Sequence, residues 1–334
     1  MFLSNFLQEK NNNVTLYTLS YKKNIFSENK IIFKIKDYSK KNILKVISLV
    51  CIAFQIRNKD FIIIWNSPMH FAWVLSKILF FSKAKLIWWN HHYPWYYCNN
   101  TGFYILLKRY IEKCLVKKID IVLSNSEFLK RELDNIWNIN SQILHPVLDE
   151  GFINYKHINK TKNNIIFSYS RWEKGKNIEM IFKTYENLKN KILDLVLIIW
   201  WDWEELQYFT NKYKNNRNVK ILWSLDTNQI LYNLNISNLV LFPSKIDSFW
   251  LVKIESMSTW TPVVCFKYPK NKETVVQNWV NGFCTESEKD FIQKTYEILT
   301  DISLKKKLSK WSLETARGFT IKHFEKQLLN IFKL

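Results

Sequence analysis

Residues Leu239–Phe266 read LVLFPSKIDSFWLVKIESMSTWTPVVCF and carry the pattern of a β-α-β unit. The apolar run Leu239–Ser244 has the length and composition of a buried strand, and so does Pro262–Phe266. A helical pattern begins between the two runs, around Trp250. Two strands joined through a helix predict parallel pairing, because parallel strands require a long crossover connection.

The same alternation of apolar runs and amphipathic segments extends through the whole chain. Near-continuous apolar strands between helices predict parallel sheets that are covered on both faces. Two such series predict an α/β fold with two doubly wound lobes, divided in the polar stretch Asp149–Asn164. The other predicted strands are Asn13–Leu19, Ile31–Lys36, Asp60–Trp65, Ala84–Trp89, Asp120–Asn125, Gln142–Pro146, Ile165–Ser170, Leu193–Ile199 and Val219–Leu222.

The net charge, the cysteines and the apolar stretches limit the partners and the compartment that this protein can have. The formal net charge of +20 suits a phosphorylated ligand, an anionic membrane surface or a nucleic acid, although AT-rich coding bias explains the lysines equally well. Most aromatic residues fall in strands or turns, so we expect no nucleic-acid partner. The five cysteines lack C-x-x-C spacing, which favours a reduced, cytoplasmic compartment without a cysteine metal site. The longest apolar stretch, near Ile43–Ile56, is too short to cross a bilayer.

Basic residues follow the predicted strand Ile165–Ser170. Arg171 and Lys176 stand at the strand end, directly before a helix, where backbone N–H groups and the helix dipole already favour an anion. Two cations there would neutralise the charge that grows on a diphosphate leaving group. A solvated basic turn would have the same composition.

Two acidic residues flank the start of the helix in the opening stretch. Asp247 and Glu255 are eight positions apart, so Glu255 can reach ribose hydroxyls and Asp247 can reach sugar hydroxyls. The backbone N–H groups of Phe249, Trp250 and Leu251 would face a phosphate. Taken alone, two spaced acids are also typical of a solvated surface.

Together these segments resemble glycosyltransferase family 4, the retaining GT-B enzymes. The family has an Arg with a Lys five residues later, and an E-x7-E signature in which Asp247 replaces the first Glu and Glu255 is the second. Segments LIIWWDWEEL (Leu197–Leu206) and QNWVNGFCTES (Gln277–Ser287) resemble two further family loops. In LIWWNHHYPWYY (Leu86–Tyr97), His92 best matches the family histidine near the donor sugar.

The resemblance implies two Rossmann-like lobes facing a central cleft. Residues 1–150 would form the acceptor-side lobe, 151–318 the nucleotide-sugar lobe, and 319–334 a helix that packs back on the first lobe. The opening MFLSNFLQEKNNNVTLYTL resembles the end of the family's first helix and its second strand, so we expect a missing first strand.

The resemblance also implies the reaction. A GDP- or UDP-sugar would be the donor, with retention and without a metal or other cofactor. A glycan or lipid-linked acceptor would receive the sugar in cell-surface polysaccharide or glycolipid synthesis, at the inner face of the membrane, and mannosyltransferases are the nearest subgroup. Arg171 and Lys176 would hold the diphosphate, Glu255 the ribose, and Asp247 and His92 the sugar.

Some features leave alternatives open. YPKNKETV replaces the Gly-Gly loop that precedes a family Glu, and together with Asp247 this keeps a non-catalytic GT-B homologue in view. The segment GFYILLKRYIEKCLVKK (Gly102–Lys118) has the pattern of a membrane-surface helix, and equally that of a core helix with a basic edge.

Tryptophan is unusually frequent and glycine unusually rare, at 15 and 5 residues. Many tryptophans fall where the resemblance expects glycine, at turns that favour a residue without a side chain. We therefore expect that UGA encodes glycine in the source organism. The suspect positions are Trp73, Trp137, Trp172, Trp200, Trp201, Trp203, Trp223, Trp250, Trp260, Trp279 and Trp311.

Overall fold

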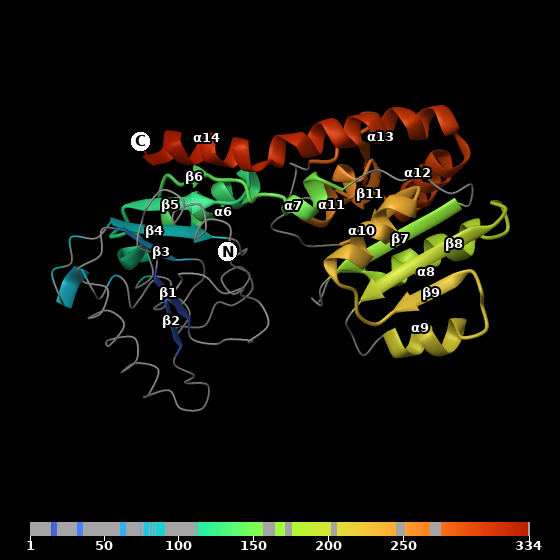
Figure 1. Ribbon diagram of the computed structural model, residues 1–334, viewed down its shortest axis with the longest axis horizontal. Helices are drawn as coiled ribbons and strands as arrows, with labels where there is room; N and C mark the ends of the chain where they lie inside the picture. The colour runs from blue at the N-terminus through green and yellow to red at the C-terminus, as the bar shows by residue number, and fades with distance from the viewer. Residues whose placement is uncertain are drawn as a thin grey trace. The chain divides into compact units, whose positions relative to one another are not determined.

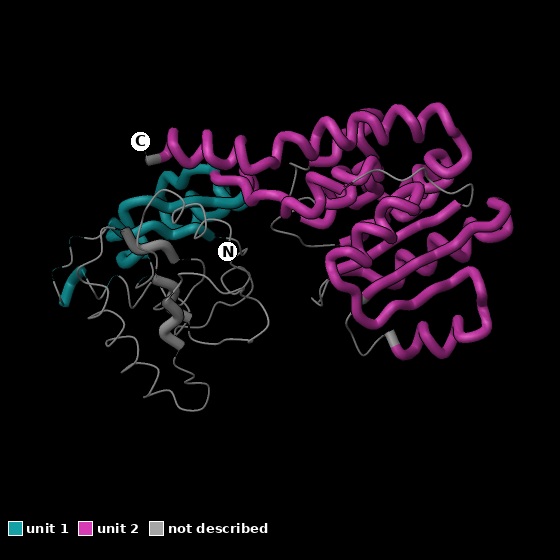
Figure 2. Tube along the Cα trace, viewed as in Figure 1, with its two compact units in different colours: residues 1–125, 129–143 teal, residues 126–128, 144–334 magenta. Residues whose placement is uncertain are grey.

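The structure is a computed structural model, and it divides into two compact units (Figure 2). One unit comprises Met1–Asn125 and Leu129–Ile143, and the other comprises Ser126–Phe128 and Leu144–Leu334. Each unit is described by itself. The described residues are 15–18, 32–35, 61–64, 74, 77–79, 81, 83, 85–90, 110, 113–155, 164–170, 176–201, 206–244, 251–267 and 275–332.

The strands of the first unit pair in parallel, as the sequence predicts. Two strands form a small sheet, and four others form a second sheet in the order β3-β4-β5-β6. Trp88 and Trp89 are buried on β4, as expected for ordinary core tryptophans. The elements are β1 (Thr15–Thr18), β2 (Ile32–Ile35), β3 (Phe61–Ile64), β4 (Lys85–Asn90), β5 (Ile121–Ser124), α6 (Glu127–Trp137) and β6 (Gln142–Ile143).

The second unit contains a six-stranded parallel sheet (Figure 1). Its order, β12-β11-β10-β7-β8-β9, means that the chain winds outward from β7 to one edge, then returns to build the other half from β10. The winding therefore reverses between β7 and β10. The strands are β7 (Asn164–Ser170), β8 (Leu195–Trp201), β9 (Val219–Leu222), β10 (Leu239–Phe242), β11 (Val263–Phe266) and β12 (Gly282–Thr285).

Helices pack on both faces of this sheet, which confirms the predicted doubly wound α/β architecture (Figure 1). Ile166 of β7 packs in a core cluster with α8, α9 and α12, whereas Phe167 packs in a second cluster with α7, α10 and α11. Successive strand residues thus face opposite layers. The helices are α7 (Glu150–Ile153), α8 (Ile178–Leu188), α9 (Leu206–Tyr213), α10 (Thr227–Ile236), α11 (Leu251–Ser258), α12 (Glu288–Thr300), α13 (Ile302–Ala316), the 3-10 turn η1 (Arg317–Phe319) and α14 (Ile321–Phe332).

Side chains strengthen the pairing of β7 with β10. The Ser168 hydroxyl donates a buried 2.8 Å hydrogen bond to the carbonyl oxygen of Leu241, 73 positions away. The backbone N–H of Ile165 donates a 2.7 Å hydrogen bond to Asn238 Oδ1. The two halves of the sheet are therefore joined at the reversal point by side-chain as well as ladder hydrogen bonds.

Strand β12 and the end of β8 are two of the differences from the sequence prediction. Strand β12 was not predicted, because four residues including a glycine form no apolar run. A Cβ at Gly282 would lie 2.2 Å from the carbonyl oxygen of Val263, so only glycine fits there. Strand β8 runs through Trp200 and Trp201, two residues past the predicted end at Ile199.

Trp260 has a backbone conformation that disfavours any bulky residue. Its φ is 60°, in the left-handed region. The N–H of Trp260 donates to the carbonyl oxygen of Met257 at 3.1 Å, and the N–H of Thr261 donates to that of Ser256 at 3.1 Å. This pair of bonds is the Schellman motif that ends helices, and its left-handed position is usually glycine.

Trp279 repeats the pattern in a turn. Its φ is 66°, and the N–H of Val280 donates to the carbonyl oxygen of Gln277 at 3.1 Å. A positive φ at the third residue of such a turn favours glycine. The other suspect tryptophans whose side chains the structure describes have no positive φ, so glycine at those positions stays a prediction: Trp137, Trp200, Trp223 and Trp311.

Candidate functional site

The strand order places the site at the reversal point of the sheet. Strand β7 ends at Ser170 and its neighbour β10 ends at Phe242, with Val240 paired to Phe167. In doubly wound sheets, ligands bind outside the carboxyl ends of the strands at the point where the winding reverses. The segments that follow Ser170 and Phe242 are those in which the sequence predicts binding residues.

Three of the predicted site residues lie within the described residues. Lys176 lies two residues before the start of α8, Leu251 is the first residue of α11, and Glu255 lies within α11. The other predicted site residues lie outside the described residues, and their roles stay predictions. They are His92, Arg171, Asp247, Phe249 and Trp250.

Lys176 is a buried cation at the end of β10. Only 8% of the residue is exposed, and its Nζ lies 5.4 Å from the centroid of the Phe242 ring. The next residue, Asn177, caps α8 with φ 56°, a conformation that asparagine tolerates. An ammonium over an aromatic face is stabilised by the ring quadrupole. Lys176 is thereby held between the two strands at which the winding reverses.

A second buried lysine approaches the same ring. Lys253, on α11, is 5% exposed, and its Nζ lies 5.0 Å from the centroid of the Phe242 ring. Two ammonium groups thus lie within cation–π distance of one aromatic ring. Two lysine side chains therefore lie at the carboxyl end of β10, where cations would suit an anionic ligand.

The side chain of Glu255, on α11, is hydrogen-bonded to a tyrosine of β7. The Tyr169 hydroxyl, on β7, donates a 2.6 Å hydrogen bond to Glu255 Oε2. Burial and the adjacent Glu255 carboxylate, in that order, raise the pKa of Tyr169 well above its usual value. The phenol therefore stays protonated and donates a hydrogen bond to the carboxylate.

Sequence reasoning missed Tyr169, Phe242 and Lys253. Tyr169 and Phe242 lie in apolar strands, where an aromatic residue indicates only core packing. Lys253 could have been singled out, because it is a charged residue on an otherwise apolar face of α11. The sequence contained no signal that would pair Tyr169 with Glu255.

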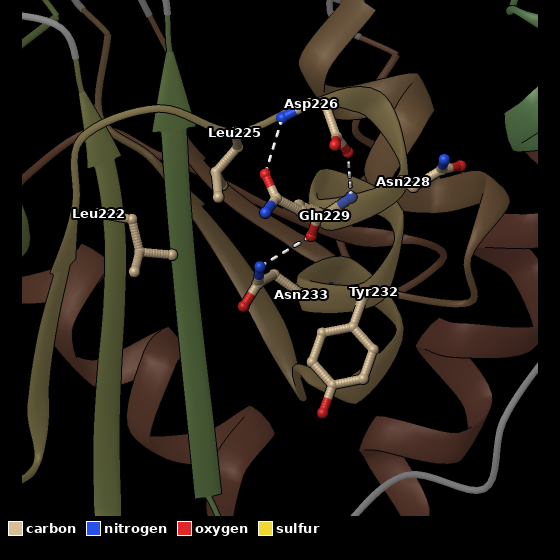
Figure 3. Close-up of a pocket in the computed structure, with 7 residues that line it drawn as sticks. All are labelled: Leu222, Leu225, Asp226, Asn228, Gln229, Tyr232 and Asn233. Atoms are coloured by element: carbon tan, nitrogen blue, oxygen red, sulfur yellow. Dashed lines mark hydrogen bonds between the residues drawn. The ribbon is translucent and has the colours of Figure 1, made fainter.

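A shallow pocket lies elsewhere in the second unit, between the end of β9 and the start of α10 (Figure 3). Its volume is about 450 Å³. Asp226 and Gln229 point toward each other there in a reciprocal capping box, which satisfies the first N–H groups of α10. None of the predicted site residues lines it; the lining residues are Leu222, Leu225, Asp226, Asn228, Gln229, Tyr232 and Asn233.

Neither a metal cluster nor a membrane-spanning helix occurs in the part of the chain that the structure describes. No cluster of three or more His, Cys, Asp or Glu side chains in those ranges could hold a metal ion. Among the same residues, every helix is too short or too polar to traverse a bilayer.

Comparison with known proteins gives the family. The family described as Glycosyl transferases group 1 matches residues 149–314. TarM of S. aureus superposes with a TM-score of 0.69 at 19% identity, over 86% of this chain and 58% of TarM, so this chain spans little more than half of TarM's length. HepE of Anabaena, solved with UDP and glucose, superposes with a TM-score of 0.71 at 14% identity, over 91% of this chain and 86% of HepE. The chain is a GT-B glycosyltransferase.

A curated relative of this GT-B glycosyltransferase comes from Campylobacter jejuni subsp. jejuni serotype O:2. It is named N-acetylgalactosamine-N,N'-diacetylbacillosaminyl-diphospho-undecaprenol 4-alpha-N-acetylgalactosaminyltransferase, and it is 25% identical over 264 residues. These residues are 76% of this chain and 70% of the relative. The predicted resemblance to a GT-B glycosyltransferase is thereby confirmed, whereas membership of family 4 and mannosyl specificity stay predictions.

Proposed function

We propose that this glycosyltransferase transfers a sugar from a nucleotide-diphosphate sugar to a lipid-linked or glycan acceptor, with retention and without a metal ion. The observation that carries the proposal is the presence of Lys176 and Glu255 at the reversal point of one parallel sheet. The cation would bind the diphosphate of a nucleotide, and the carboxylate would bind its ribose.

Lys176 is suited to the diphosphate. Its ammonium is largely shielded from water, and charge interactions are stronger where water is excluded. The negative charge on the leaving diphosphate grows as the bond to the sugar breaks, so a fixed cation lowers the energy of the transition state. Arg171, five residues earlier in the sequence, would supply a second cation.

Glu255 is suited to the ribose. A carboxylate accepts hydrogen bonds through two oxygens, and ribose presents two neighbouring hydroxyl donors. Asp247 and His92 would contact the transferred sugar, as the family resemblance implies. HepE and TarM have been solved in complex with UDP, which supports a UDP-sugar donor, and a GDP-sugar is the alternative.

The relatives also bear on the acceptor. The Campylobacter relative is named for transfer to a diphospho-undecaprenol-linked disaccharide through a 4-alpha bond. An α-configured nucleotide sugar would retain its configuration in such a product. We therefore propose an acceptor on a lipid diphosphate and action at the cytoplasmic face of the membrane, in the synthesis of a cell-surface polysaccharide or glycolipid.

Radiolabelled UDP- and GDP-sugars test the proposal. The protein is incubated with each donor and undecaprenyl-diphosphate-linked acceptors, with and without EDTA. Label should enter the organic-extractable product in both conditions, and NMR should show the anomeric configuration of the donor. Loss of transfer in EDTA would contradict metal independence. Nucleotide binding without transfer to any acceptor would instead favour the non-catalytic homologue, and absence of nucleotide binding would overturn both.

A further inference from the structure

A buried tyrosine controls the orientation of the proposed ribose-binding carboxylate. Tyr169 is 3% exposed, and its hydroxyl donates a 2.6 Å hydrogen bond to Glu255 Oε2, across 86 positions of sequence. We propose that Tyr169 is a positioning residue that fixes the Glu255 carboxylate in the orientation that receives the ribose hydroxyls. This inference rests on the proposed function, because it takes Glu255 as the ribose ligand.

The tyrosine is a rigid donor. Strand β7 lies between β10 and β8 in the interior of the sheet, and Tyr169 is the register partner of Trp200 on β8. Its ring stacks on Phe167 with centroids 5.0 Å apart and an angle of 12° between the planes. Packing and the strand backbone therefore both restrict where the hydroxyl can lie.

The glutamate, by contrast, needs such a partner. A glutamate side chain has several accessible rotamers, and it loses this freedom when a ligand binds. A preformed hydrogen bond restricts Glu255 before the ligand arrives, so less entropy is lost on binding. The bond also comes from β7, the strand that leads to Arg171, so one strand would set both the ribose contact and the start of the diphosphate loop.

The hydrogen bond leaves the chemistry of the carboxylate suited to ribose. A tyrosine hydroxyl donates one proton, and a carboxylate has about four acceptor positions on its two oxygens. The raised pKa of Tyr169 keeps that proton on the phenol throughout the pH range of an assay. Tyr169 thus orients Glu255 without neutralising it.

Tyr169→Phe tests the inference, because it removes the hydroxyl and retains the ring that stacks on Phe167. Binding of UDP, GDP and their 2′-deoxy and 3′-deoxy analogues is measured by calorimetry for the wild type, Tyr169→Phe and Glu255→Ala. Tyr185→Phe is the matched control, because Tyr185 is equally buried in the opposite core cluster, where its hydroxyl accepts a bond from Asn216.

We expect the wild type to bind the ribonucleotide about 10- to 100-fold more tightly than at least one deoxy analogue, as for a hydrogen bond to a charged group. Tyr169→Phe should weaken ribonucleotide binding about tenfold and reduce that discrimination by a similar factor, with KM raised more than kcat is lowered. Glu255→Ala should abolish the discrimination, and Tyr185→Phe should preserve it.

Each contrary outcome is informative. If Glu255→Ala binds ribonucleotide as the wild type does, the proposed role of Glu255 fails. If Glu255→Ala loses discrimination but Tyr169→Phe keeps it, the proposed function stands and the positioning role of Tyr169 is overturned. Weaker binding of every analogue by the same factor in Tyr169→Phe would show a structural effect only, and would also overturn the inference.

Discussion

The ammonium of Lys176 lies 5.4 Å from the centroid of the Phe242 ring, although Lys176 follows β7 and Phe242 ends β10, three strands later in the sequence. This contact links the loop after β7 to the end of β10. It holds a buried cation at the reversal point, where doubly wound sheets bind their ligands. Lys176 is therefore the first residue to test.

Lys176→Ala should reduce kcat for sugar transfer about 10²- to 10³-fold, the usual effect of losing a preorganised charge contact. Unfolding by urea should change much less than the rate, because the charge that Lys176 would stabilise grows only during transfer. Lys191→Ala, at an exposed lysine of the same unit, is the control and should retain full activity. Equal activity in the two variants would contradict the role of Lys176.

Strain at Trp260 can be measured by comparing two small residues. The Trp260→Gly variant should be more stable to unfolding than the Trp260→Ala variant by about 1–2 kcal/mol. The reason is that φ is 60° at this position and a Cβ disfavours the left-handed region. At position 311, inside α13, the Trp311→Ala variant should instead be more stable than the Trp311→Gly variant by about 0.5–1 kcal/mol. Urea unfolding of the four variants gives both differences. Greater stability of alanine than of glycine at position 260 would show that this position is not strained.

Protein from the natural source should contain glycine at positions 260 and 279. Both positions have left-handed backbone in motifs that favour glycine, whereas the Cβ of tryptophan disfavours this conformation. Peptide mass mapping distinguishes the two residues directly. Tryptophan at both positions in the natural protein would refute the recoding hypothesis, and the codons behind these residues provide an independent check.

Lys117 and Lys118 should support binding to anionic membranes. Both are exposed, whereas Val116 and Ile119 beside them are buried, so the described part of this segment has a basic edge. Each lysine near an anionic surface contributes about 1 kcal/mol. At low salt, the wild type should float with phosphatidylglycerol liposomes, whereas the double variant Lys117→Glu/Lys118→Glu should stay in the unbound fraction.

The control for this prediction reverses the same charge elsewhere. Lys306→Glu/Lys307→Glu, on α13, should float as the wild type does. Equal loss in both double variants would indicate an effect of net charge alone, and no flotation of the wild type would leave the segment as a core helix with a solvated edge.

The strands were predictable from the sequence because buried parallel strands are nearly continuous apolar runs, as in Leu239–Phe242. Strand β12 was not, since Gly282–Thr285 is short and its need for glycine comes from the carbonyl of Val263 on the adjacent strand. Lys176 and Glu255 could be proposed as site residues because they follow β7 and β10 in the sequence, and their roles stay predictions. Tyr169 was not, because its partner is fixed by packing between distant segments.

The hydrogen bond between Ser168 and Leu241 has a consequence for how this lobe is made. During synthesis β7 emerges first, and β8 can pair with it as soon as it follows. The opposite edge of β7 stays unpaired until the ribosome has produced 73 further residues. Contacts over such a separation slow folding, and an open strand edge invites association with other chains in the meantime. Folding of the lobe is therefore expected to be limited by the arrival of β10, and chains stalled before Leu239 should aggregate.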